Sequence, residues 1–102
     1  MGCKVIFSPQ ALADLEAAVR FIAQDNSAAA VRFGNALIDR AAVLENFPLL
    51  GSPYSKRPGV RKLVFRPYLI FYRFRKKENC VDILRYWHSA QRKPDLPAIE
   101  TS

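Results

Sequence analysis

The chain has 102 residues, of which half are apolar and a quarter charged. This length allows one domain with one core, and the apolar content excludes a disordered chain. With two cysteines, one histidine and no zinc-like spacing between them, we expect no metal site, no cofactor and no disulfide framework. Cys3 and Cys80 lie in strand-like contexts, where a free thiol behaves as a small apolar residue.

Positive charge is concentrated in one half of the sequence. The formal net charge is +7, with 16 lysines and arginines against 9 acidic residues. Residues 51–93 hold twelve of the basic residues against only Glu78 and Asp82, whereas residues 1–50 are close to neutral. Such a one-sided distribution favours nucleic acid or an acidic protein as partner. A basic surface without a partner is the alternative.

The first half of the chain predicts one strand and two helices. Residues 3–7 are a short strand, after which Ser8 and Pro9 provide an N-cap and a first residue for a helix over residues 9–25. A short break precedes a second helix over residues 28–45, with Ser27 as its expected N-cap, so the two helices form an antiparallel hairpin. The expected buried stripes are periodic apolar positions. They are Leu12, Leu15, Val19 and Ile22 on the first helix, and Val31, Gly34, Leu37, Ile38, Ala41 and Leu44 on the second.

The second half predicts three strands after a loop. Pro48 ends the helix, residues 51–53 shape a loop, and residues 54–59 are expected to be exposed. Runs rich in β-branched and aromatic residues then predict strands over residues 60–65, 68–75 and 80–87. Alternation along the middle strand assigns four residues to its core side. They are Tyr68, Ile70, Tyr72 and Phe74.

The element order is therefore β-α-α-β-β-β, which predicts an α+β fold. We expect the helical hairpin to pack on one face of a mainly antiparallel four-stranded sheet. The domain should cover residues 1–93, and residues 94–102 should form a poorly ordered tail. The sequence carries neither a secretory signal nor a segment of transmembrane length, so we expect a cytoplasmic protein without a membrane partner.

Three motifs in this order resemble the RelE/ParE superfamily of toxins from bacterial type II toxin–antitoxin modules. They are FPLLG at residues 47–51, GVRKLVFRPYLIFYRF at 59–74 and ILRYWHSAQR at 83–92. The resemblance extends from Lys4 to about Arg92 and implies the same fold. It also implies a cognate antitoxin that neutralises the toxin in a hetero-oligomeric complex.

The superfamily implies two possible activities. RelE-like members cleave mRNA on the ribosome, a metal-free reaction that needs a base, an acid and cations. ParE-like members bind and poison DNA gyrase, which needs a complementary surface and no catalytic groups. The candidate catalytic residues for cleavage are Arg61, Arg85, His88 and Arg92. The candidate residues for binding a target or nucleic acid are Arg61, Arg73, Arg85, Arg92 and Lys93.

His88 favours RNA cleavage, whereas two leucines argue against it. An imidazole can act as acid or base near neutral pH, and His88 matches a histidine of some RNA-cleaving members. However, Leu63 and Leu69 stand where RNA-cleaving members carry cations. The leading hypothesis is therefore a toxin that binds its target without cleaving RNA, and the resemblance implies DNA gyrase as that target. The alternatives are a ribosome-dependent mRNA endoribonuclease, a basic RNA-binding module and an inactive toxin homologue.

Overall fold

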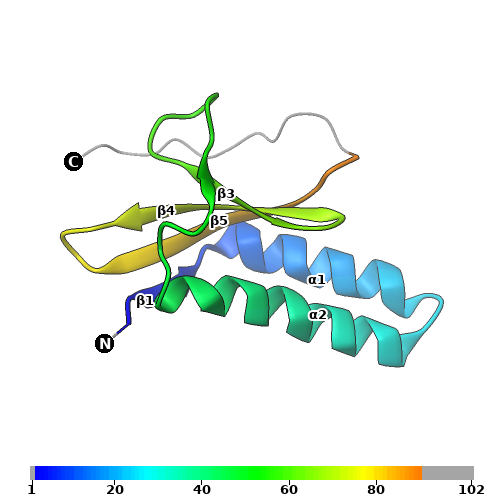
Figure 1. Ribbon diagram of the computed structural model, residues 1–102. Helices are drawn as coiled ribbons and strands as arrows, with labels where there is room; N and C mark the ends of the chain where they lie inside the picture. Colours follow the sequence, from blue (N-terminus) through cyan, green and yellow to red (C-terminus); the bar gives the residue numbers. More distant parts are fainter. Residues whose placement is uncertain (1, 91–102) are drawn as a thin grey trace.

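Two helices lie side by side against one face of a sheet in the computed structural model, which describes residues 2–90 (Figure 1). The predicted α+β class and the position of the helical hairpin are confirmed. In chain order the elements are β1 (Lys4–Phe7), α1 (Pro9–Ala23), α2 (Ser27–Ala42), the 3-10 turn η1 (Val43–Glu45), β2 (Ser52–Pro53), β3 (Arg61–Phe65), β4 (Tyr68–Arg75) and β5 (Cys80–His88). The predicted tail over residues 94–102 lies outside the described residues.

The sheet has five strands in the order β1-β5-β4-β3-β2, so the prediction of four strands was wrong. The additional strand is β2, in which Ser52 pairs with Lys62 and Pro53 with Arg61. Proline lacks an N–H and is therefore tolerated at a sheet edge. Because proline and glycine also typify loops, the sequence of residues 51–53 predicted a loop and not this edge strand. β1 runs parallel to β5, whereas the other neighbours are antiparallel.

Side-chain caps fix where the helices begin. The Ser8 hydroxyl accepts a hydrogen bond from the Ala11 N–H at 3.0 Å, with Pro9 as the first helical residue, as predicted. The same hydroxyl donates to the Leu84 carbonyl of β5 at 3.0 Å, which ties the helix start to the sheet. The expected cap of α2 was wrong, because the Asn26 side chain accepts from Ala29 N at 2.9 Å and Ser27 is already helical.

The buried faces of the helices are rotated relative to the predicted stripes. Leu12, Val31 and Ile38 are 51%, 61% and 40% exposed, so these three assignments were wrong. α1 instead buries Ala11 and Ala18, because small side chains let the helix approach the sheet and α2 together. Close approach at Gly34 is confirmed: a Cβ there would lie 2.8 Å from Val19 Cγ2. Gly34, Leu37, Ala41 and Leu44 are buried, as predicted.

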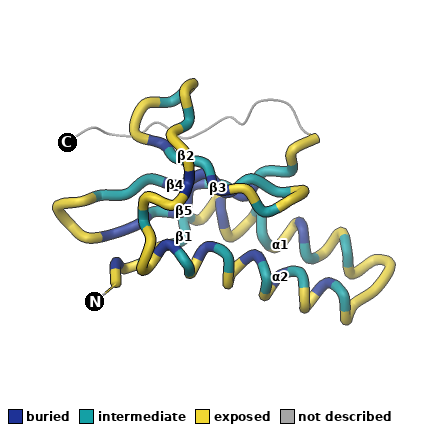
Figure 2. Tube along the Cα trace, in the orientation of Figure 1, coloured by how far each residue is buried: buried dark blue, intermediate teal, exposed yellow. Residues whose placement is uncertain are grey.

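Both faces of the sheet carry buried apolar side chains, although the helices lie on one face only (Figure 1). The buried positions are the dark blue stretches along the helices and strands in Figure 2. Tyr68, Ile70, Tyr72 and Phe74 pack in the core between sheet and helices, which confirms the predicted alternation. On the other face Val60, Phe71 and Leu84 form a second cluster, against which Tyr54, Leu69 and Trp87 pack. The prediction that residues 54–59 are all exposed was therefore wrong for Tyr54. Its ring meets Phe71 at 4.9 Å between centroids.

Cys3 and Cys80 are both free and buried, as expected of small apolar residues. Within residues 2–90 no three His, Cys, Asp or Glu side chains come together as a metal site. No helix of the described chain is long and apolar enough to cross a membrane.

Candidate functional site

A shallow pocket of about 420 Å³ lies where the end of β5 meets α1. Asp14 and Phe21 of α1 line one side of it, and Tyr68, Arg85 and His88 line the sheet side. Tyr68 pairs with His88 across β4 and β5, and their rings meet edge to face at 5.2 Å. Two of the predicted candidates, Arg85 and His88, are therefore brought together.

Arg85 is held by a carboxylate of α1. Its Nε and Nη2 donate to the two oxygens of Asp14 at 2.7 and 2.9 Å, a bidentate geometry that is strong and directional. Asp14 also accepts from the backbone N–H of Tyr86 at 3.1 Å. The guanidinium lies 5.0 Å from the centre of the Trp87 ring. Asp14 thus joins α1 to β5.

His88 already uses one ring nitrogen in a local turn. Its Nδ1 accepts a hydrogen bond from the Ala90 N–H at 3.0 Å, so in the neutral ring the proton is carried by Nε2. To act as a base, the ring would have to take up a proton at the nitrogen that holds this turn. The local geometry therefore suits a structural or binding histidine better than an acid–base catalyst.

Tyr68 is the other titratable side chain in contact with His88. Burial, and then the negative charge of Asp14, raise the pKa of the Tyr68 phenol. The phenol therefore stays protonated at neutral pH and can donate a hydrogen bond but not accept a proton. Tyr68 therefore supplies no base to the pocket, and the carboxylate of Asp14, which also lines it, is engaged by Arg85.

Arg61 and His88 lie on different strands, on either side of β4. Arg61 of β3 pairs with Tyr72 of β4, and His88 of β5 pairs with Tyr68 of β4. Because Tyr68 and Tyr72 are four residues apart on one strand, about 13 Å separate Arg61 from His88 along the strand direction. The Arg61 guanidinium donates to the carbonyls of Gly51 at 2.9 Å and Leu49 at 3.2 Å. It therefore supports the loop before β2 and does not join the pocket beside α1.

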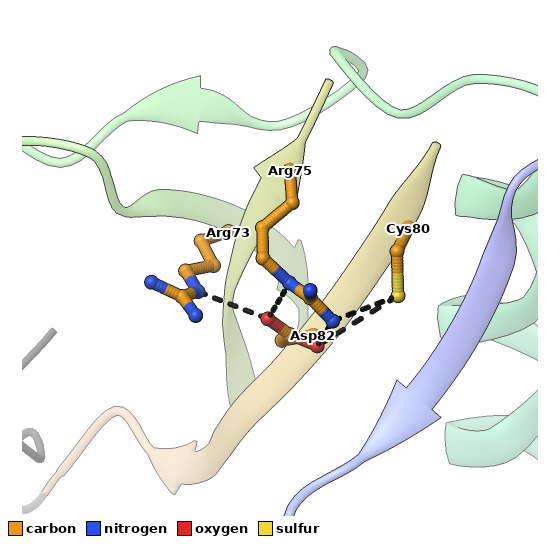
Figure 3. A network of polar contacts seen from close by, with 4 residues as sticks. All are labelled: Arg73, Arg75, Cys80 and Asp82. Carbon is orange, nitrogen blue, oxygen red and sulfur yellow. Dashed lines mark hydrogen bonds and ion pairs between the residues drawn. The ribbon is translucent and has the colours of Figure 1, made fainter. Parts of the chain in front are cut away.

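Arg73 and Arg75 of β4 converge on Asp82 of β5 (Figure 3). Arg73 Nε lies 2.9 Å from the carboxylate, and Arg75 binds both of its oxygens at 2.7 and 3.0 Å. Arg75 also donates to the Cys80 thiol at 3.2 Å. Burial by itself would raise the pKa of Asp82, but hydrogen bonds and positive charge from Arg75 and Arg73 outweigh it. The pKa of Asp82 is therefore lowered.

Because the pKa of Asp82 is lowered in the folded state, the free energy of unfolding should depend on pH in the acid range. Because the folded pKa lies below the unfolded value of about 4, this contribution is present above pH 4 and is lost as pH falls through the folded value. We expect the stability of Asp82→Asn to fall less steeply than that of the wild type below pH 4. Urea unfolding between pH 6 and pH 2 measures this, with the exposed Asp39→Asn as control. Parallel curves for Asp82→Asn and wild type would contradict the assignment.

Leu63 and Leu69 occupy apolar surroundings. Leu63 is 4% exposed in the main core, and Leu69 packs against the cluster on the other face of the sheet. A cation at position 63 would need a large rearrangement, since an isolated buried charge is costly. The remaining candidates, Arg92 and Lys93, lie outside the described residues.

Sequence reasoning missed two side chains that organise these sites. Asp14 bonds to a residue 71 positions away, and no local pattern encodes such a pair. Tyr72, assigned to the core, also uses its hydroxyl: it donates to the Pro48 carbonyl at 2.8 Å and accepts from Gly51 N at 2.9 Å. A tyrosine in place of phenylalanine at a core position was the available signal, because a buried hydroxyl needs partners.

The arrangement of helices and sheet is shared with chains of two toxin–antitoxin systems. A chain of the chromosomal ParDE system from P. aeruginosa matches with a TM-score of 0.72 and 21% identity, covering 84% of this chain and 95% of that chain. A chain of the toxin–antitoxin complex RelBE2 from Mycobacterium tuberculosis matches with a TM-score of 0.66 and 25% identity. The match covers 86% of this chain and 99% of that one. The class of protein is therefore that of the RelE/ParE toxin fold.

The family model described as the ParE toxin of type II toxin–antitoxin system, parDE, matches residues 5–93. The chain belongs to this family of toxins. A comparison with curated proteins gave no match.

Proposed function

We propose that this toxin arrests bacterial growth by binding its target without cleaving RNA, and that the target is DNA gyrase. Gyrase is the target that the resemblance to ParE toxins implies. The alternative within the same fold is a ribosome-dependent mRNA endoribonuclease that uses Arg61, Arg85, His88 and Arg92.

The separation of the candidate catalytic residues is the observation that carries this proposal. Cleavage of RNA by its own 2′-hydroxyl needs a base, an acid and cations around one phosphate. Arg61 lies about 13 Å along the sheet from His88 and holds a loop, while Arg85 is engaged by Asp14. Leucines fill the two positions where RNA-cleaving members carry cations. These features favour a binding surface over a nuclease site.

The proposal includes a cognate antitoxin and a cytoplasmic location. Without an antitoxin, an active toxin would arrest its own host. The basic half of the chain, residues 51–93, suits an acidic antitoxin segment that becomes ordered on binding.

Two purified reactions distinguish the alternatives. We expect the wild-type chain to inhibit DNA supercoiling by gyrase and to leave ribosome-bound mRNA intact. We also expect His88→Ala to arrest growth as the wild type does, within about twofold, because the proposal requires no acid–base chemistry from the imidazole. The measurement is the mapping of mRNA 5′ ends after incubation with ribosomes and toxin. Toxin-dependent cleavage that disappears in His88→Ala would establish the nuclease instead.

A further inference from the structure

An exposed apolar loop joins η1 to β2. We use the name apolar loop for residues 47–50, whose sequence is Phe-Pro-Leu-Leu. Phe47, Leu49 and Leu50 are 61%, 61% and 48% exposed. Large apolar side chains gathered in one segment of a surface mark interaction sites more often than single exposed ones do.

The backbone of the apolar loop is fixed from the sheet. The Tyr72 hydroxyl bonds to the Pro48 carbonyl and to the Gly51 N–H, and Arg61 bonds to the carbonyls of Leu49 and Gly51. A turn bond from Leu50 N to the Phe47 carbonyl, at 3.0 Å, closes the loop on itself. Two carbonyls of the loop and two backbone groups of the adjoining Gly51 are thus held by two side chains of neighbouring strands, while the apolar side chains of the loop are largely exposed.

Such a fixed loop is suited to binding. A segment that is already ordered loses less conformational entropy when a partner covers it, so more of the apolar burial appears as affinity. The exposed apolar side chains of the loop add little to stability, because only burial of apolar surface is favourable. The combination of a rigid backbone and exposed leucines therefore indicates a contact surface.

Positive charge accompanies the apolar loop. Arg61 bonds to its backbone, and Lys62, the next residue of β3, pairs with Ser52 of β2 and has its side chain on the other face of the sheet. Within residues 2–90 no carboxylate forms an ion pair with Arg61 or Lys62. A partner that covers the loop would therefore be expected to bring acidic groups to its rim, which steers association and fixes orientation.

We propose that the apolar loop inserts into an apolar, carboxylate-rimmed depression on the toxin's folded protein target. This inference rests on the proposed function, because it names the element by which the toxin binds that target. A rigid loop with exposed apolar side chains cannot reshape itself around a partner, so it needs an apolar depression that already exists there, which a folded protein provides. An antitoxin segment that becomes ordered on binding would instead need a groove or strand edge on the toxin.

A matched pair of double variants tests the proposal. Leu49→Ala with Leu50→Ala removes two exposed leucines from the loop, and Leu12→Ala with Val31→Ala removes two side chains of similar exposure, 51% and 61%, from the helices. Purified gyrase is the probe for target binding, and growth arrest is measured at equal expression. We expect the loop variant to lose about tenfold or more in gyrase affinity and to lose growth arrest. The helix variant should behave as the wild type.

A third variant separates the loop's shape from its apolar side chains. Tyr72 is fully buried, so a partner does not touch it. Tyr72→Phe removes the two hydroxyl bonds to the loop and should weaken gyrase binding as a positioning effect. Added to the loop variant, it should weaken binding no further, because the contact that it positions is already gone. Additive losses would assign Tyr72 a role unrelated to the loop.

The possible outcomes are distinguishable. Growth arrest by the loop variant equal to that by the wild type would overturn this inference and leave the proposed function standing. An equal loss of affinity for the cognate antitoxin would also overturn it, since the loop would then belong to the antitoxin interface. If the wild type arrests growth without binding gyrase, gyrase is not the target. Loss of growth arrest in the loop variant but not in the helix variant would then still support the role of the loop, and equal arrest by both would overturn it. A wild-type chain that neither binds gyrase nor arrests growth would overturn both proposals.

Discussion

Replacing Asp14 by alanine is expected to lower the free energy of unfolding by about 3 kcal/mol. The substitution removes the carboxylate that binds Arg85 through two hydrogen bonds and that accepts from the Tyr86 N–H. The side chains of Asp14 and Arg85 are only 17% and 16% exposed, so water compensates poorly for the lost partner. The value lies at the low end for a buried pair because some exposure remains.

Urea unfolding measures the effect of Asp14→Ala, and Glu16→Ala is the matched control. Glu16 forms an ion pair with Arg20 on the same helix, but both side chains are about two-thirds exposed or more, at 67% and 72%. Exposed pairs contribute about 0–1 kcal/mol, so the control should be nearly neutral. Equal destabilisation by the two variants would mean that the Asp14 pair does not join α1 to β5.

Replacing Gly51 by alanine is expected to cost about 1–3 kcal/mol and to displace the apolar loop. An added Cβ would lie 2.7 Å from the Lys62 carbonyl oxygen and 2.9 Å from the Tyr72 ring. The first of these is a backbone atom of β3, which cannot move without disturbing the pairing of β2 with β3. We therefore expect Gly51→Ala to lose stability and, if the loop contacts the target, to lose growth arrest as well.

Thermal unfolding and growth arrest together measure the effect of Gly51→Ala. Ser52→Ala is the control, because Ser52 is the next residue in the chain and is exposed. That variant should match the wild type in both measurements. Normal stability of Gly51→Ala would show that the loop and β2 tolerate a larger separation from β3 than the described geometry implies.

Local chemistry made the main elements of this fold predictable from the sequence. The pair Ser8–Pro9 defines the start of α1, because serine caps a helix and proline suits its first position. Alternation along residues 68–75 correctly assigned the core side of β4, since side chains of a strand point to opposite faces in turn. Both signals act within a few residues.

Tertiary context decided what the sequence did not reveal. Leu12 and Val31 fit an amphipathic stripe, yet the close packing of Ala11, Ala18 and Gly34 turned other faces of the helices inward. The bond between Asp14 and Arg85 joins residues far apart in the chain. Of the predicted site residues, Arg85 and His88 share a pocket, while Arg61 and Arg73 lie elsewhere on the sheet because the register of β3, β4 and β5 places them there.

The most direct test of the central claim is pulse-labelling of DNA, RNA and protein synthesis in bacteria just after induction of this chain without its antitoxin. A toxin that binds gyrase without cleaving RNA should reduce DNA synthesis first, while protein synthesis continues. A prompt fall in protein synthesis while DNA synthesis continues would contradict the account and identify a translation-blocking nuclease.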